Sequence, residues 1–294
     1  MTIEILDRDS LKGEATAPAT APTRPDRRPD RRPDRRASEA QLQLLSWAAP
    51  AAVLLLWEAA SRAGLIAPQV LPAPSVVAQT GWKLIASGEL PKHLGASLLR
   101  AAAGFVIGGG IGFALGVLVG FSRLAEAALD RSIQMIRAIP FLALLPLVIV
   151  WFGVDESGKI FLVSLAVLFP IYINTVLGIR QVDPKLLELA RVTGLSRLQT
   201  IRRIILPGAM PSILTGVRYA LATAWLALVI AETVATTRGI GFLAMDAREF
   251  LQTNVIVLTI LIYAAIGVGA DASARLLERN LLSWHPNYAK GGRK

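Results

Sequence analysis

Long apolar segments separated by short polar stretches dominate the chain from residue 42 onward. Each apolar segment is close to the roughly 20 residues that an α-helix needs to cross a bilayer. The sequence therefore predicts an all-α membrane protein with six transmembrane helices. The predicted spans are residues 44–65, 97–121, 132–152, 160–179, 212–234 and 255–274.

Two connections between the spans are predicted to form short helices outside the bilayer. Residues 76–94 follow a proline-rich loop, residues 67–74, and are predicted to form an amphipathic surface helix. Residues 236–251 are too polar to cross a membrane, and a helix is predicted there over residues 242–250.

The second span contains five glycines at intervals of four residues, which places them on one stripe of a helix. Small residues let two helix backbones approach closely, and such packing drives helix association within a bilayer. The stripe is therefore predicted to face another helix. Its members are Gly104, Gly108, Gly112, Gly116 and Gly120.

The third span contains Pro140 and Pro146. Each proline lacks the N–H that would bond to the carbonyl four residues earlier, so a kinked or interrupted helix is predicted. Interrupted helices line transport pathways in some proteins and only pack in others, and the sequence leaves both roles open.

Residues 1–41 contain three consecutive copies of Pro-Asp-Arg-Arg after a stretch rich in Ala, Thr and Pro. This composition cannot form a core, so a disordered tail of unassigned role is predicted. A secretory signal peptide is disfavoured because the first apolar run begins only near residue 42. Residues 42–285 are predicted to form the transmembrane domain, and residues 286–294 a basic C-terminal tail.

The composition excludes several classes of protein. A hydrophobic content of 53% and a mean hydropathy of +0.52 are too high for a soluble domain. The absence of cysteine excludes disulfides and thiolate chemistry, and two histidines far apart offer no spacing for a metal site. The net charge of +10 is spread over loops and tails instead of forming one basic stripe, so no nucleic acid partner is predicted. No cofactor is predicted either.

One segment imitates a phosphate-binding loop. Residues 153–159, GVDESGK, match G-x-x-x-x-G-K, but Ile160 occupies the position of the Ser or Thr that would hold magnesium. A phosphate-binding loop is therefore not predicted.

The basic residues predict the orientation of the chain. Of the 31 Lys and Arg residues, 22 fall in the two tails and in the loops after spans two and four, five fall in the alternate loops, and four lie in or at the ends of spans. Cytoplasmic loops carry an excess of Lys and Arg. Both termini and the loop between spans four and five are therefore predicted to be cytoplasmic.

That loop, residues 183–207, combines apolar helical faces with basic residues. Leu186, Leu187 and Ala190 predict a first short helix, and Gly194 is predicted to break it. A second short helix is predicted to follow and to end at Pro207.

The spacing within the loop resembles the coupling-loop signature of ABC importer permeases, which is E-A-A, three residues, G, nine residues and I-x-L-P. Only Leu189 departs from it, where Ala is usual. The resemblance implies a type I ABC importer permease fold, in which this loop fits a cleft on a separate cytoplasmic ATP-binding subunit. The residues that carry it are Glu188, Ala190, Gly194, Ile204, Leu206 and Pro207.

Segments from residue 132 to the end of the last span resemble the aliphatic sulfonate branch of the sulfonate, taurine and nitrate permeases. The resemblance implies a homodimer in the bacterial inner membrane, two copies of the ATP-binding subunit and a periplasmic solute-binding protein. The subunit itself would catalyse nothing. Taurine and nitrate stay open as substrates.

Two other functional classes compete with the permease. A stand-alone channel or secondary transporter would leave the coupling signature unexplained. A membrane enzyme would need a catalytic cluster, which the sequence lacks.

Polar and amphipathic side chains within the spans are the candidates for the transport pathway. They are Asn174, Trp225 and Glu232. Asn174 is predicted to form a hydrogen bond between helices, with a substrate contact as the alternative. Glu232 would repel an anion, so a role in gating or packing is favoured. Arg218 is predicted to reach the cytoplasmic interface, although an anionic substrate would give it a second use.

Overall fold

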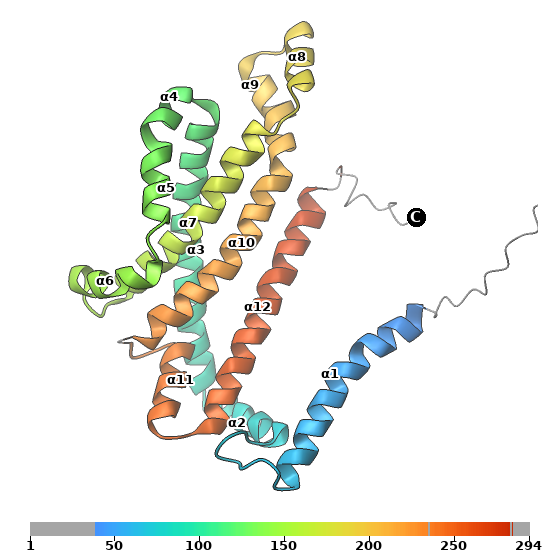
Figure 1. Ribbon diagram of the computed structural model, residues 1–294, viewed down its shortest axis with the longest axis vertical. Coiled ribbons are helices and arrows are strands. Elements are labelled where there is room, and N and C mark those ends of the chain that lie inside the picture. Colours follow the sequence, from blue (N-terminus) through green and yellow to red (C-terminus); the bar gives the residue numbers. More distant parts are fainter. Residues whose placement is uncertain (1–38, 235, 283, 285–294) are drawn as a thin grey trace, which may run out of the picture. The chain divides into compact units, whose positions relative to one another are not determined.

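The computed structural model describes residues 39–234, 236–282 and 284, and every regular element in these ranges is helical (Figure 1). The chain divides into two compact units, residues 1–51 and 52–294, and the second contains all elements after α1. The elements are α1 (Glu39–Arg62), α2 (Pro74–Ala86), α3 (Glu89–Phe121), α4 (Arg123–Ala125), η1 (Glu126–Asp130), α5 (Arg131–Arg137), η2 (Phe141–Leu144), α6 (Leu145–Phe152), α7 (Glu156–Arg180), α8 (Pro184–Val192), α9 (Arg197–Thr200), η3 (Ile201–Ile205), α10 (Leu206–Thr233), α11 (Ile240–Glu249) and α12 (Thr253–Leu281). Residues 39–41 of the predicted N-terminal tail belong to α1, while residues 1–38 and the C-terminal tail, residues 286–294, lie outside the described residues.

Four helical segments in the described residues are long and apolar enough to cross a membrane. They are α3, α7, α12 and the continuous segment Arg197–Thr233, which joins α9, η3 and α10. A fifth candidate is the bent pair Arg123–Arg137 and Phe141–Phe152. Helix α1 covers most of the first predicted span without being among these candidates. The all-α class is thus confirmed, and the number of six spans stays a prediction.

The third predicted span is broken at Pro140, where its two parts meet at 84°. Because a residue before proline is disfavoured in the α conformation, the helix ends ahead of this position. Pro146 does not interrupt a helix, contrary to the prediction. It lies in the first turn of α6, where the N–H that proline lacks would have no partner within the helix.

Helices α3 and α7 pack with their backbones in close approach, and the glycine stripe of α3 faces α7 along this contact. A Cβ atom added to Gly104 would lie 2.5 Å from Val163, and one added to Gly116 would lie 2.6 Å from Thr175. At Gly108 and Gly112 the nearest atoms are backbone oxygens, those of Ser164 and Leu168. At Gly120 it is the side chain of Ile179 that lies 2.8 Å away.

We expect Gly108→Ala to destabilise the bundle, because backbone cannot move aside as a side chain can and overpacking costs about 1–3 kcal/mol or more. Gly110→Ala is the matched control two residues away, since a Cβ there meets no described atom within 4 Å. Alanine favours helix over glycine by about 1 kcal/mol, so the control should be neutral or stabilising. Thermal unfolding of both variants in detergent measures the difference, and equal midpoints would contradict the packing role.

Helix α7 also packs along α10, around a core formed by Val163, Val167, Ile171, Ala220, Ala224, Ala227 and Leu228. Pro170 interrupts the hydrogen bonds of α7 because it cannot donate to the carbonyl of Ala166. The hydroxyl of Thr223 on α10 lies 3.2 Å from that carbonyl, and it also lies 3.1 Å from the carbonyls of Tyr219 and Ala220 in its own helix. The proline thus leaves α7 helical, with a hydroxyl of the neighbouring helix within hydrogen-bond distance of the free carbonyl.

The connection before α3 differs from the prediction. The predicted surface helix over residues 76–94 is divided at Gly88, whose φ of 77° ends α2. The residues from Glu89 onward form the first turns of α3, which is therefore a 33-residue helix. The predicted helix over residues 242–250 is present as α11.

Candidate functional site

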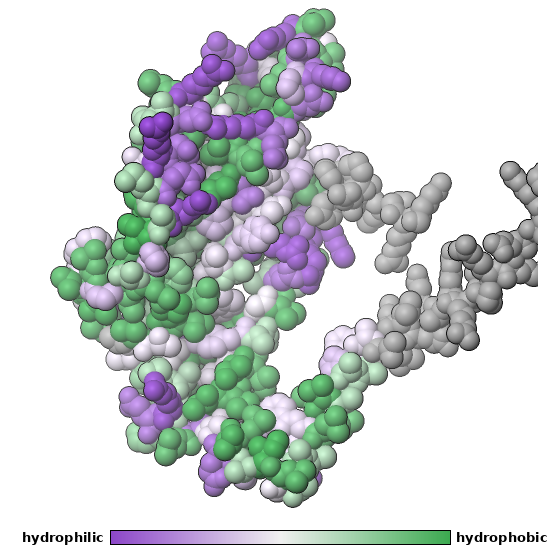
Figure 2. Space-filling model, viewed as in Figure 1, coloured by the Kyte–Doolittle hydropathy of each residue, from purple (hydrophilic) through white to green (hydrophobic). Residues whose placement is uncertain are grey.

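Two regions at opposite ends of the second unit contain the six signature residues and Glu232 (Figure 1). One end carries α8 and α9, and the other carries α2 and α11. Figure 2 shows hydrophilic side chains gathered at the α8–α9 end, with apolar surface predominating over α6.

Helix α8 is capped at both ends. The carboxylate of Asp183 accepts a hydrogen bond from the N–H of Lys185 at 2.9 Å, and Pro184 occupies the first turn. At the other end Gly194 has a φ of 70°, and the N–H of Leu195 bonds to the carbonyl of Ala190 at 2.9 Å. This is the Schellman arrangement, in which a left-handed residue satisfies the last carbonyls of a helix. A Cβ at this position would meet no described atom within 4 Å, so lack of space does not explain the glycine. The left-handed backbone conformation does.

The second short helix does not end at Pro207, contrary to the prediction. A capping box formed by Ser196 and Gln199 begins α9, which continues through η3 into α10. In η3 the N–H of Leu206 bonds to the carbonyl of Ile201, five residues back, which is the π-helical spacing. Pro207 lies in the first turn of α10 directly after it. The helix therefore continues from the α8–α9 end to Thr233 without interruption.

The six signature residues differ in how far they are buried. Ala190 is buried and Ile204 and Pro207 are half-buried, whereas Glu188, Gly194 and Leu206 are exposed. Beside them stand exposed apolar side chains that the sequence reasoning did not single out as a surface. They are Leu186, Leu189, Val192 and Leu198, with Val192 reaching 86% exposure. We call these four side chains the hairpin apolar surface; exposed apolar groups of this kind suit contact with another protein.

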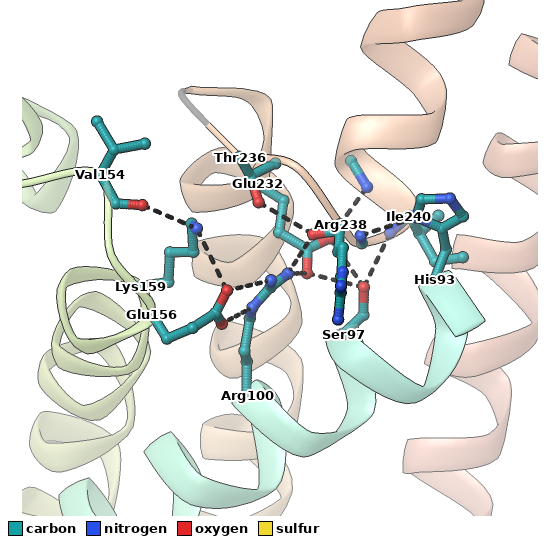
Figure 3. Close-up of polar contacts among 12 residues, drawn as sticks. His93, Ser97, Arg100, Val154, Glu156, Lys159, Glu232, Thr236, Arg238 and Ile240 are labelled. Carbon is teal, nitrogen blue, oxygen red and sulfur yellow. Dashed lines mark hydrogen bonds and ion pairs between the residues drawn. The ribbon is translucent and has the colours of Figure 1, made fainter. Parts of the chain in front are cut away.

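The other end contains a buried polar cluster centred on Arg100 (Figure 3). Its guanidinium donates to Glu232 at 2.6 Å through Nη1, to Glu156 at 2.6 Å through Nη2, and again to Glu156 through Nε. The side chain of Glu232 is fully buried, while that of Glu156 is 58% exposed. The cluster thus joins α3, the start of α7 and the end of α10.

The same cluster holds the turn that leads into α11. The hydroxyl of Ser97 donates to Glu232 and accepts from the N–H of Ile240 at 2.9 Å. The N–H of Gly241 donates to Glu232 at 3.0 Å, and that of Gly239 donates to His93 at 3.0 Å. A Cβ on Gly239 or Gly241 would meet Glu232 at 2.5 Å, so only glycine allows this approach.

The charges of the cluster are paired within it. Arg100 forms an ion pair with Glu232. Glu156 pairs with both Arg100 and Lys159, and the Nζ of Lys159 lies 3.6 Å from it. The same ammonium group donates to the carbonyl of Val154 at 3.2 Å. This buried lysine belongs to the segment that imitates a phosphate-binding loop, and here its ammonium group is used inside the protein. Removing one partner of a buried ion pair costs several kcal/mol of folding free energy. The cluster is therefore suited to holding α3, α7 and α10 together at this end.

The structure does not bring the three pathway candidates together. Glu232 belongs to the buried cluster, and Asn174 lies in the contact between α7 and α10, where its side chain packs against Gly216. The amide of Asn174 donates to the carbonyl of Pro170 in its own helix at 2.9 Å, so the predicted bond between helices is wrong for the side chain. Its backbone carbonyl instead accepts from Ser212 of α10. Of the three, Trp225 alone lines a groove, between α10 and α12.

Comparison with known proteins gives a family match and similar chains. The family described as binding-protein-dependent transport system inner membrane component matches residues 108–283. The chain is 53% identical, over 84% of its length and 94% of the relative's, to a protein of Escherichia coli strain K12 designated aliphatic sulfonates transport permease protein SsuC. It is 47% identical to the Bacillus subtilis strain 168 protein of the same designation, over 81% and 87% of the two chains.

More distant similarities extend the comparison. The taurine transport system permease protein TauC of Escherichia coli strain K12 is 36% identical over 80% of this chain and 87% of its own. Among solved structures, the MetNI methionine ABC transporter in an inward facing conformation matches with a TM-score of 0.50. The match has 21% identity and covers 68% of this chain and 98% of the other, and it concerns the fold alone.

Proposed function

Because the chain belongs to the family of binding-protein-dependent transport system inner membrane components, we propose that it is the permease subunit of an ABC importer that moves aliphatic sulfonates into the cytoplasm. The substrate is inferred from one observation, the similarity to two sulfonate permeases over more than four fifths of the chain. ATP hydrolysis belongs to a separate partner subunit in this proposal, and the permease catalyses nothing.

The α8–α9 end is proposed as the docking site of the ATP-binding subunit. The hairpin apolar surface supplies exposed contact area there, and exposed apolar groups of this kind gain by leaving water. The signature residues Glu188 and Gly194 lie on the same short hairpin, and Ala190 fixes α8 from its buried side. The positive-inside count supports a cytoplasmic position for this end and for both termini.

Movement of this hairpin would be transmitted through continuous helix. The 28 residues of α10 span roughly 42 Å at 1.5 Å per residue. This helix begins next to the docking end, and its last turn contains Glu232 of the buried cluster. A displacement produced by the closing of two ATP-binding subunits would therefore reach the opposite end, where the periplasmic solute-binding protein would deliver substrate. A homodimer of six-span subunits in the inner membrane completes the proposal.

Taurine is the alternative substrate that a specific observation supports, since the chain is 36% identical to a taurine permease. We expect the transporter, reconstituted with its own ATP-binding and solute-binding subunits, to take up radiolabelled alkanesulfonate in competition with unlabelled alkanesulfonate. Taurine and nitrate at the same concentration should compete poorly. Equal or stronger competition by either would replace the proposed substrate while leaving the importer role intact.

A further inference from the structure

A groove with a volume of about 660 Å³ lies between α10 and α12. Figure 1 shows the two helices running side by side. Its lining includes Arg218, Tyr219 and Trp225 from α10 and Tyr263 and Asp271 from α12. The groove is therefore polar at one position along its length and aromatic at another, and no part of the buried cluster at Arg100 lines it.

The ion pairs at the polar part of the groove join two guanidinium groups to one carboxylate, that of Asp271. Nη2 of Arg218 lies 2.6 Å from Oδ1 of Asp271, and the other oxygen of Asp271 pairs with Arg275. One carboxylate thus serves two guanidinium groups. A guanidinium has five N–H donors, and Arg218 is 46% exposed, so donors remain for an anion that enters the groove. Glu278 also lines the groove, seven residues beyond Asp271, where it is buried and engaged in an interaction of its own.

The aromatic part of the groove lies about two helical turns from Arg218. Trp225 is seven residues further along α10, a rise of roughly 10 Å. Its ring meets that of Tyr263 edge to face, with centroids 6.4 Å apart and an interplanar angle of 76°. The buried hydroxyl of Tyr263 has no hydrogen-bond partner among the described residues. The groove therefore offers an apolar wall that leads away from the charged group.

This arrangement matches a molecule with a compact anionic head and an apolar chain. A sulfonate presents three acceptor oxygens to a guanidinium, as a phosphate does, and gains charge-assisted hydrogen bonds. An alkyl chain extending from it would lie against the indole ring of Trp225 and lose contact with water. A headgroup without a chain, such as nitrate, would use only the charged part.

Resting on the function proposed above, we propose that the groove between α10 and α12 is a binding site for the transported alkanesulfonate within the permease. Arg218 contacts the sulfonate, and Trp225 contacts the alkyl chain. Asp271 holds Arg218 in place when the groove is empty and competes with the anion for it.

The test is calorimetric titration of hexanesulfonate and methanesulfonate into the permease assembled with its ATP-binding subunit in lipid nanodiscs. Arg218→Gln should weaken hexanesulfonate binding about tenfold or more, the effect of losing a hydrogen bond between charged groups. Arg218→Lys should retain part of the affinity. Arg123→Gln, which changes an exposed arginine of α4, should bind as the wild type does. Trp225→Leu should reduce the preference for hexanesulfonate over methanesulfonate.

Asp271→Asn separates a binding site from a structural ion pair. If Asp271 competes with the ligand, its neutralisation should tighten hexanesulfonate binding. Weaker binding in Asp271→Asn, or wild-type binding in Arg218→Gln, would overturn the proposed site. Uptake of sulfonate by a wild-type complex that shows no binding in the groove would overturn the site and leave the proposed function standing. Binding without any sulfonate uptake would support the site and remove the proposed function.

Discussion

Replacement of Gly194 by arginine is expected to abolish ATP-driven uptake and to release the ATP-binding subunit while the chain stays in the membrane. Gly194 has a φ of 70° in the turn that ends α8, a conformation that costs an L-residue about 1–2 kcal/mol. The Cβ of the arginine would meet no described atom within 4 Å. The charged side chain would begin at the turn between α8 and α9, the two helices that carry the hairpin apolar surface. Pull-down of the co-expressed ATP-binding subunit and uptake by vesicles measure the two effects.

Gly88→Arg is the matched control for this substitution. Gly88 has a φ of 77°, is exposed, and likewise has no described atom within 4 Å of an added Cβ. It lies between α2 and α3, at the end opposite the hairpin. The same backbone strain and the same side chain should leave the ATP-binding subunit bound. Loss of association in both variants would attribute the effect to general destabilisation, and retention in Gly194→Arg would show that the hairpin is not the docking site.

Arg100→Met is expected to destabilise the protein strongly. It leaves the fully buried carboxylate of Glu232 without its cation, and breaking a buried pair in this way costs about 3–5 kcal/mol. Glu156 is half-exposed and can return to water, so the loss arises chiefly at Glu232. The thermal unfolding midpoint of the full chain in detergent, followed by fluorescence-detected size exclusion, measures it.

Arg62→Met provides the comparison at an exposed ion pair. Arg62 contacts Glu58 at 2.6 Å, but its side chain is 70% exposed, and surface pairs contribute about 0–1 kcal/mol. Its midpoint should lie close to that of the wild type. The double variant Arg100→Met with Glu232→Met should recover part of the stability, because no buried charge is then left unpaired. An Arg100→Met variant as stable as the wild type would contradict the role of the buried cluster as an anchor.

The features predicted well from the sequence depend on local pattern. Apolar segments of span length located α3, α7, α10 and α12, since hydrophobicity over about 20 residues is decided within the segment itself. Gly194 was predicted to break α8 because glycine adopts a left-handed conformation without strain. The resemblance to ABC importer permeases rested on the spacing around Glu188, and the resemblance to the sulfonate branch rested on longer segments. Both are confirmed by the family match and the similar chains.

The features missed depend on residues distant in sequence. Arg100 and Glu232 are 132 residues apart, and no spacing relates an arginine in one apolar segment to a carboxylate in another. One local signal was present, because His93, Ser97 and Arg100 recur at intervals of four and three and so share one face of α3. Pro207 was mistaken for the end of a helix, because the π-helical turn before it cannot be recognised from proline alone.

The most direct test of the importer role is solute uptake by proteoliposomes that contain the chain with and without its ATP-binding subunit. With the solute-binding protein present, alkanesulfonate should accumulate only when both subunits and ATP are supplied, and accumulation should cease when ATP is replaced by a non-hydrolysable analogue. Uptake by the purified chain alone, without ATP, would contradict the account and identify a channel or secondary transporter.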